Sequence, residues 1–70
     1  MTVPFRISIK AARINVNLSL DEAAEKIGVN KRTLINYEKG TTIPNWETAD
    51  KMSDVYGIPT DYLRFEKAPS

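Results

Sequence analysis

The chain has 70 residues and a net charge of +1, and it contains no Cys and no His. A chain of this length forms one domain with a small core, because folding buries only about 60% of its unfolded surface. Without Cys or His, disulfides, thiolate zinc sites and the usual general base are excluded. No apolar run approaches the roughly 20 residues that cross a bilayer. We therefore expect a cytoplasmic protein that is not an enzyme and uses no metal or cofactor.

The charge is unevenly divided along the chain. Residues 1–40 carry seven cations and four carboxylates, a balance of +3, and residues 41–70 have a balance of −2. A basic first half favours an anionic partner bound on one side, although an asymmetry of this size is also common in other proteins.

The helical periodicity predicts an all-α, compact domain of five short helices without strands. This domain is expected over residues 1–65, with a short flexible tail at residues 66–70. The first helix is expected from about Ile7 or Ser8 to Asn15, with Asn17 in the left-handed conformation after its end.

The second and third helices have clear start and stop signals. Ser19 and Glu22 form a capping box at the start of the second helix, and Gly28 ends it. Asn30 caps the third helix, which extends to Lys39 and is stopped by Gly40.

The last two helices are weaker predictions. Asn45 caps a fourth helix from Trp46 to Tyr56, and a fifth begins near Pro59 or Thr60. Carboxylates on the fourth helix are expected to form a solvated face rather than a metal site, because their spacing does not converge on one point; they are Glu47, Asp50 and Asp54. Several large apolar side chains are expected in the core rather than in a site: Tyr37, Ile43, Trp46 and Tyr56.

Two helices joined by about three residues through a glycine are typical of a helix-turn-helix. Ala24 is small enough for the third helix to cross closely over the second, Gly28 makes the turn, and Leu34 fills the space between them. Short helical hairpins that bind no DNA can have the same pattern.

The first turn of the third helix carries two cations, Lys31 and Arg32. Cations are unfavourable there, by about 0.3–1 kcal/mol each at low salt, because the helix N-terminus is already partly positive. Local rules are most often broken at functional sites. Arg and Lys can bind guanine O6 and N7, and Asn36, one turn later, can bind adenine. The alternative is that all three are ordinary solvated side chains.

The segment "LSLDEAAEKIGVNKRTLINYEKGTTIPNWETADKMSDVYGIPTDYL" resembles the DNA-binding domain of the phage lambda-type repressor and Cro family, also called Xre-type. The similarity extends from about Ile9 to Leu63 and includes "YEKG" at Tyr37–Gly40. The resemblance implies a lambda-repressor-like fold whose recognition helix is the third helix. It places four residues at positions that face base edges or the nearest phosphates: Asn30, Lys31, Arg32 and Asn36.

The resemblance also assigns supporting roles. In the family an arginine of the first helix pairs with a glutamate late in the recognition helix, and Arg13 and Glu38 stand at these positions. Leu20 occupies a position where the family often has a phosphate-binding glutamine; leucine cannot form that hydrogen bond but can touch a thymine methyl group. The loop after the recognition helix lacks the family's usual basic residues. Phosphate contacts are expected from Lys10, Asn17, Ser19, Leu20, Thr33, Lys39, Thr41, Thr42 and Asn45.

These features together predict a sequence-specific transcriptional regulator, of the phage or prophage repressor type, that binds a near-palindromic double-stranded DNA operator as a dimer. The alternative is an antitoxin or anti-repressor-like module that uses the same scaffold to bind a protein. No membrane or small-molecule partner is expected. Dimerisation is expected through the C-terminal region, with Ile58, Tyr62, Leu63 and Phe65.

Overall fold

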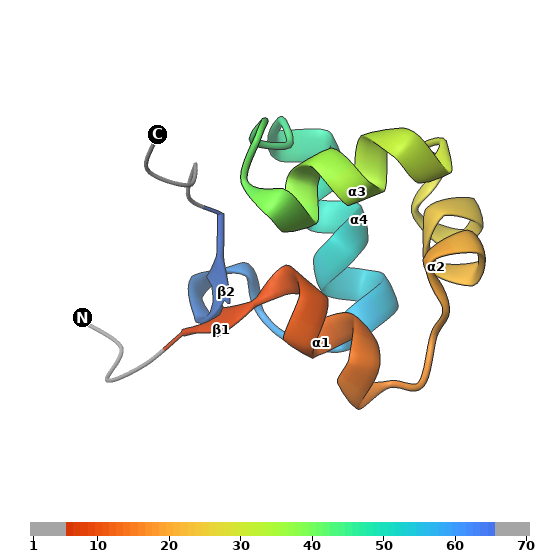
Figure 1. Ribbon diagram of the computed structural model, residues 1–70. Helices are drawn as coiled ribbons and strands as arrows, with labels where there is room; N and C mark the ends of the chain where they lie inside the picture. The colour runs from red at the N-terminus through yellow and green to blue at the C-terminus, as the bar shows by residue number, and fades with distance from the viewer. Residues whose placement is uncertain (1–5, 66–70) are drawn as a thin grey trace.

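The computed structural model describes residues 6–65, and the predicted tail at residues 66–70 lies outside this range. The order of elements is strand, four α-helices, a 3-10 helix and a second strand (Figure 1). Their bounds are β1 Ile7–Ser8, α1 Ile9–Asn15, α2 Leu20–Ile27, α3 Lys31–Lys39, α4 Trp46–Tyr56, η1 Thr60–Tyr62 and β2 Leu63–Arg64. None of the helices within residues 6–65 has the length and apolar character needed to cross a bilayer.

Each α-helix begins where a short polar side chain caps its first turn. The side-chain oxygens of Ser8, Ser19, Asn30 and Asn45 accept hydrogen bonds from backbone N–H groups three residues later, at 2.7–3.1 Å. These bonds satisfy donors that have no partner within the helix. The left-handed conformation expected for Asn17 is confirmed, with φ of 59°.

Two predictions about the architecture were wrong. The described chain contains a short parallel pair of strands, in which Ile7 lies opposite Leu63 and Ser8 opposite Arg64. The expected fifth helix is only the three-residue 3-10 helix η1. Leu63 is 2% exposed and enters the core directly after η1, so the chain becomes extended there and pairs with the segment before α1. Strands of two residues are too short to produce an alternating sequence pattern.

The core lies where α1, α2, α3 and α4 meet. Its buried side chains are Ile9, Ala12, Ala23, Ala24, Ile27, Leu34, Met52, Tyr56 and Leu63. Gly28 has φ of +91°, a conformation that L side chains rarely adopt, and it allows the chain to turn from α2 into α3. The small side chain of Ala24 and the completely buried Leu34 fill the contact between these two helices, as the sequence predicted.

The prediction that Trp46 and Ile43 belong to the core was also wrong. Trp46 is 81% exposed and Ile43 is 50% exposed. Ala49, Met52 and Tyr56 already form the buried stripe of α4, and Trp46 lies at the first position of the helix, beyond the end of this stripe. Tyr56 is buried as expected, and Tyr37 is partly buried against the core.

The proposed C-terminal dimer surface needs a further correction. Leu63 is 2% exposed and paired in β2, so it cannot contact a second copy. Ile58 and Phe65 are partly buried against the core, while Tyr62 is 37% exposed. These residues therefore do not form one free apolar surface, because most of their apolar area covers the domain's own core.

Candidate nucleic-acid interface

The first turn of α3 presents its two cations to solvent. Lys31 and Arg32 are exposed, and no carboxylate lies within this turn. By contrast, the first turn of α2 contains Asp21 and Glu22. Lys31 Nζ lies 3.7 Å from Asp21 Oδ1 in a solvent-exposed pair, and such pairs contribute little to stability. The positive charge at the N-terminus of α3 is thus only weakly neutralised by nearby carboxylates, and it remains available to bind an anion.

The remaining residues of α3 divide between an inner and an outer face. Leu34 is buried and Tyr37 packs against the core. Arg32 and Lys39 are exposed, and Asn36, one turn after Arg32, is half-buried. The helical period of 3.6 residues therefore places Arg32, Asn36 and Lys39 on the side away from the core.

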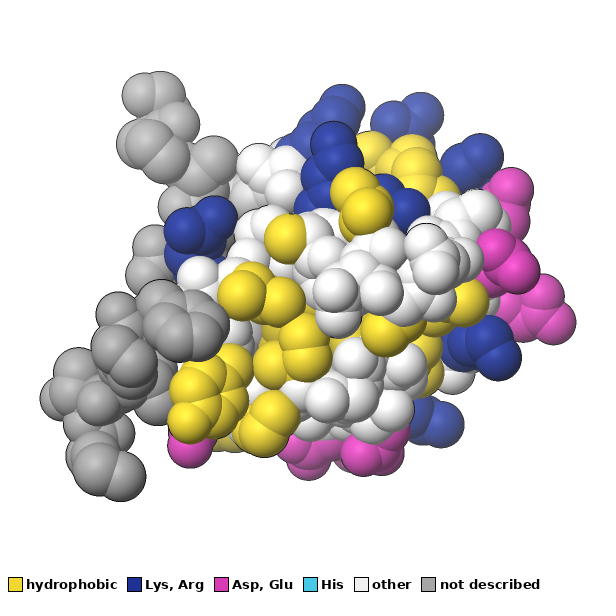
Figure 2. All heavy atoms as spheres, turned by 90° about the horizontal axis from the view of Figure 1, so that it is seen from below, with side chains coloured by type: hydrophobic (Ala, Val, Ile, Leu, Met, Phe, Trp, Pro, Cys, Tyr) yellow, Lys and Arg dark blue, Asp and Glu magenta, His cyan; other side chains and the backbone are white. Residues whose placement is uncertain are grey.

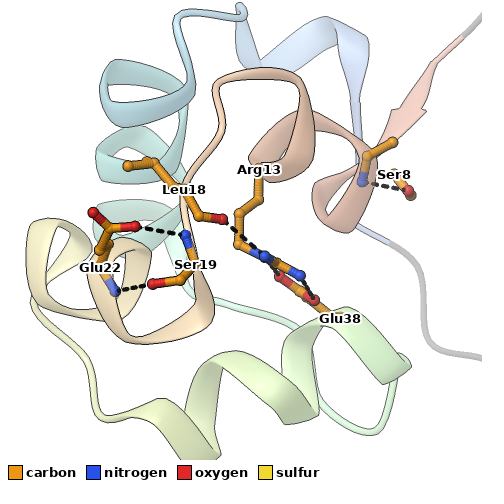
Figure 3. A network of polar contacts seen from close by, with 7 residues as sticks. Ser8, Arg13, Leu18, Ser19, Glu22 and Glu38 are labelled. Atoms are coloured by element: carbon orange, nitrogen blue, oxygen red, sulfur yellow. Dashed lines mark hydrogen bonds and ion pairs between the residues drawn. The ribbon is translucent and has the colours of Figure 1, made fainter.

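A buried ion pair joins α1 to the second half of α3 (Figure 3). Arg13 Nε donates to Glu38 Oε2 at 2.6 Å, and Nη2 donates to Glu38 Oε1 at 3.2 Å. Arg13 Nη1 donates to the carbonyl oxygen of Leu18 at 2.9 Å. The side chains of Arg13 and Glu38 are only 11% and 8% exposed, and the hydrogen bond to Glu38 raises the pKa of Arg13. The structure thus brings these two residues together in a bidentate pair that fixes α3 against α1.

Three of the predicted contact residues use their side-chain oxygens to cap helices. Asn30 Oδ1 accepts from the Thr33 N–H at 2.7 Å, and Asn45 Oδ1 accepts from the Thr48 N–H at 2.9 Å. Ser19 Oγ accepts from the Glu22 N–H at 3.1 Å. Each of these side chains still has a donor, an amide N–H or a hydroxyl, that can bind a phosphate oxygen. The capping bonds hold those donors at the N-termini of helices, where anions are favoured.

A hollow of about 290 Å³ lies between α1, the start of α2 and α3. Leu20 and Ile35 form its apolar part, and Lys10 and Lys39 are exposed cations at its border. The structure therefore brings Leu20, Lys10 and Lys39 together beside α3. Ile35 was missed in the sequence; it is half-buried and lies about 100° around the helix from the buried Leu34.

Other predicted phosphate contacts lie at the ends of helices. Asn17, Thr41 and Thr42 are exposed in the connections that follow α1 and α3, and Thr33 is half-buried in the first turn of α3. In Figure 2 several Lys and Arg side chains lie along the upper edge of the molecule and others lie at its left and right sides, while carboxylates lie along the lower edge and the right side. Residues 6–65 contain no group of three His, Cys, Asp or Glu that could hold a metal ion.

Comparisons with known proteins agree with this geometry. A family model described as Helix-turn-helix matches residues 9–63. The chain is 42% identical over 55 residues to the cryptic phage CTXphi transcriptional repressor RstR of Vibrio cholerae, covering 79% of this chain and 50% of that protein. It is 38% identical over 55 residues to the HTH-type transcriptional regulator ImmR of Bacillus subtilis (strain 168), covering 79% of this chain and 43% of that protein.

The chain thus spans about half the length of the curated relatives that it matches. No solved structure matches the chain significantly. The match extends over α1 to α4 and ends at Leu63, so it includes the helix pair, the Arg13–Glu38 bridge and the cationic start of α3. The chain belongs to the lambda-repressor-like, Xre-type helix-turn-helix family.

Proposed function

We propose that this domain binds double-stranded DNA sequence-specifically and acts as a transcriptional repressor. The observation that carries the proposal is the exposed pair of cations at the start of α3, a helix that the buried Arg13–Glu38 pair fixes in place. Membership of the family supports the proposal, as do two relatives named as a transcriptional repressor and a transcriptional regulator.

In this proposal α3 enters the major groove with its N-terminus first. Lys31, Arg32 and Asn36 contact base edges, and Asn30 contributes a side-chain N–H nearby. Arg32 is suited to guanine, because its guanidinium can donate to O6 and N7 together. Asn36 is suited to adenine, because its amide oxygen can accept from N6–H while its amide N–H donates to N7.

Phosphates on either side of the groove would contact the residues around α3. Lys10 and Lys39 supply charge, Thr33, Thr41 and Thr42 supply hydroxyls, and Asn17, Ser19 and Asn45 supply short polar donors. Leu20 contributes through its backbone N–H, which lies in the first turn of α2 and has no acceptor within that helix. Two copies would bind a near-palindromic operator with recognition helices in successive major grooves, about 34–36 Å apart.

Selection from a random duplex pool, followed by gel-shift titration, tests the proposal. Arg32→Ala should weaken binding to the selected site by about 5- to 150-fold and relax the preference at one base pair. Lys51→Ala is a matched control, because it removes one exposed positive charge from α4, on the acidic half of the chain.

Salt dependence gives the second readout. Affinity for duplex should fall steeply between about 50 and 200 mM salt, because phosphate contacts release counterions. If Arg32→Ala and Lys51→Ala have equal effects, the assignment of α3 as the reading helix is wrong. If no duplex is bound even at low salt, the anti-repressor or antitoxin alternative replaces the DNA-binding proposal.

A further inference from the structure

One apolar side chain of α3 is sheltered from water outside the core. Ile35 is half-buried. Within residues 6–65, however, the partly buried apolar side chains that pack against the core include Leu20 and not Ile35. Both side chains line the hollow of about 290 Å³ between α1, the start of α2 and α3. This hollow, rather than the core, therefore accounts for the partial burial of Ile35, and neither the packing of the domain nor the polar DNA contacts proposed above use its aliphatic side chain.

We propose that Ile35 and Leu20 together recognise the 5-methyl group of one thymine in the operator, which enters this hollow. The inference rests on the proposed function and deepens it by naming one base and the two side chains that select it. Thymine is the only one of the four standard DNA bases with a methyl group on its major-groove edge. Aliphatic side chains favour a methyl group, because contact removes apolar surface from water, and they disfavour the polar N7 of a purine, which finds no donor there.

The helical period places Ile35 next to the side of α3 that is proposed to read bases. At about 100° per residue, Ile35 lies about 60° around the helix from Arg32 and about 40° from Lys39. Both of these cations are exposed. Along the helix axis Ile35 lies about 4.5 Å beyond Arg32, which is close to the rise of about 3.4 Å between successive bases of one strand. The thymine is therefore expected near the base pair that Arg32 reads.

The buried polar groups that line the hollow already have partners. Arg13 and Glu38 line it and form the bidentate pair, with hydrogen bonds of 2.6 and 3.2 Å. Arg13 also donates to the carbonyl oxygen of Leu18 at 2.9 Å, which ties the pair to the segment before α2 (Figure 3). A methyl group that displaces water from the hollow therefore leaves this guanidinium and carboxylate satisfied. The cost of an unpaired polar group, which would oppose binding of an apolar ligand, does not arise from this pair.

The border of the hollow suits the backbone of the strand that carries the thymine. Lys10 and Lys39 are exposed cations in its lining. The backbone N–H of Leu20, proposed above to bind a phosphate, lies in the first turn of α2 at the same place. Phosphate contacts fix the register of a protein on DNA, and contacts to base edges specify the sequence. The cations and the N–H would hold the strand at the border, while the aliphatic side chains meet the methyl group inside. A phosphate is a poorer occupant of the interior, because leucine and isoleucine side chains offer it no donor.

Uracil substitution tests the inference, because uracil differs from thymine only in lacking the methyl group. Each thymine in one half of the selected site would be replaced by uracil in turn, and binding would be measured by gel-shift titration. One substitution, near the base pair whose preference Arg32→Ala relaxes, should weaken binding about 4-fold, equivalent to about 0.8 kcal/mol for one buried methyl group. 5-Bromouracil at that position should restore the affinity, because bromine is apolar and fills nearly the same space as a methyl group.

Ile35→Ala and Ile14→Ala form a matched pair of variants. Both truncate an isoleucine, but Ile14 is 54% exposed on α1 and lies outside the described lining of the hollow. In Ile35→Ala the effect of the uracil substitution should fall from about 4-fold to below about 1.5-fold, because the methyl group has lost its contact. Leu20→Ala is the second variant and should reduce the effect in the same way, whereas Ile14→Ala should retain the 4-fold effect. Each variant is compared with itself on the two duplexes, so a general loss of affinity from a merely structural change cancels.

The outcomes distinguish this inference from the proposed function. If the wild type binds the selected site and Arg32→Ala weakens binding, but no uracil substitution does, the proposed function stands and the inference is overturned. If one uracil substitution weakens binding equally in the wild type, Ile35→Ala and Leu20→Ala, another part of the protein recognises the methyl group and the inference is again overturned. If the wild type binds no duplex, the proposed function fails and the inference fails with it.

Discussion

Replacing Glu38 with alanine should remove a large part of the folding free energy, because it leaves the guanidinium of Arg13 without its counter-charge. The two side chains are 11% and 8% exposed, so they are almost fully removed from water. Breaking a buried ion pair by removing one partner costs about 3–5 kcal/mol. The residual exposure at Arg13 allows some hydration, so we take the lower end, about 3 kcal/mol. A domain of 70 residues is stabilised by only about 3.5–10 kcal/mol in total.

Urea unfolding followed by far-UV circular dichroism measures this change. Trp46 fluorescence would be a poor probe of unfolding, because the indole is 81% exposed in the folded state. A loss of about 3 kcal/mol corresponds to a fall in Tm of about 12–24 °C for a domain of this size. The double variant Arg13→Met, Glu38→Leu is the control, since replacing both charges with apolar groups should restore most of the lost stability.

Two results would refute this reasoning. If Glu38→Ala unfolds within about 1 kcal/mol of the wild type, the pair behaves like an ordinary surface contact. If the double variant is as unstable as Glu38→Ala, the loss comes from packing rather than from an unpaired buried charge. Either result would remove the reason to regard the pair as the support of α3.

Three further predictions concern helix ends and a buried tyrosine. Arg32→Ala should raise the free energy of unfolding by about 0.3–1 kcal/mol in low salt and by much less in about 1 M salt, because it removes a cation from a helix N-terminus; a loss of stability in urea unfolding would contradict this. Ser19→Ala should lower the free energy of unfolding by about 1 kcal/mol, because it removes the acceptor of the Glu22 N–H, and an unchanged Tm would contradict the capping role. Burial raises the pKa of Tyr56 to about 12 from its ordinary value of about 10. The stability that Tyr56 contributes is therefore complete below about pH 10 and is lost as pH rises to about 12, by roughly 2.7 kcal/mol in all. Urea titrations of Tyr56→Phe should lack this component, and the same decline in that variant would assign it to other groups.

The helix boundaries could be read from the sequence because their causes are local. Ser19, Asn30 and Asn45 each bond to an N–H three residues later, and Gly28 ends α2 in the left-handed conformation. The misplaced charges of the third helix could be recognised for the same reason, since a helix N-terminus disfavours cations whatever surrounds it. Arg13 and Glu38 are 25 residues apart, and only the family resemblance suggested that they meet.

Composition and local spacing thus determined a small helical domain, the start and end of α2, α3 and α4, the end of α1, and the turn at Gly28, but the expected start of the first helix at Ile7 or Ser8 was wrong, because these residues form β1 and Ser8 caps α1. The tertiary structure decided that Trp46 stays in solvent, that Leu63 is buried, and that Ile7 pairs with Leu63 in a two-residue ladder. The sequence shows which side chains are apolar and therefore favour burial. Which of them are buried depends on how α1 to α4 pack against one another and against β1 and β2. Helix α4 fills its buried stripe with Ala49, Met52 and Tyr56, and the hydrophobic indole of Trp46 therefore remains outside.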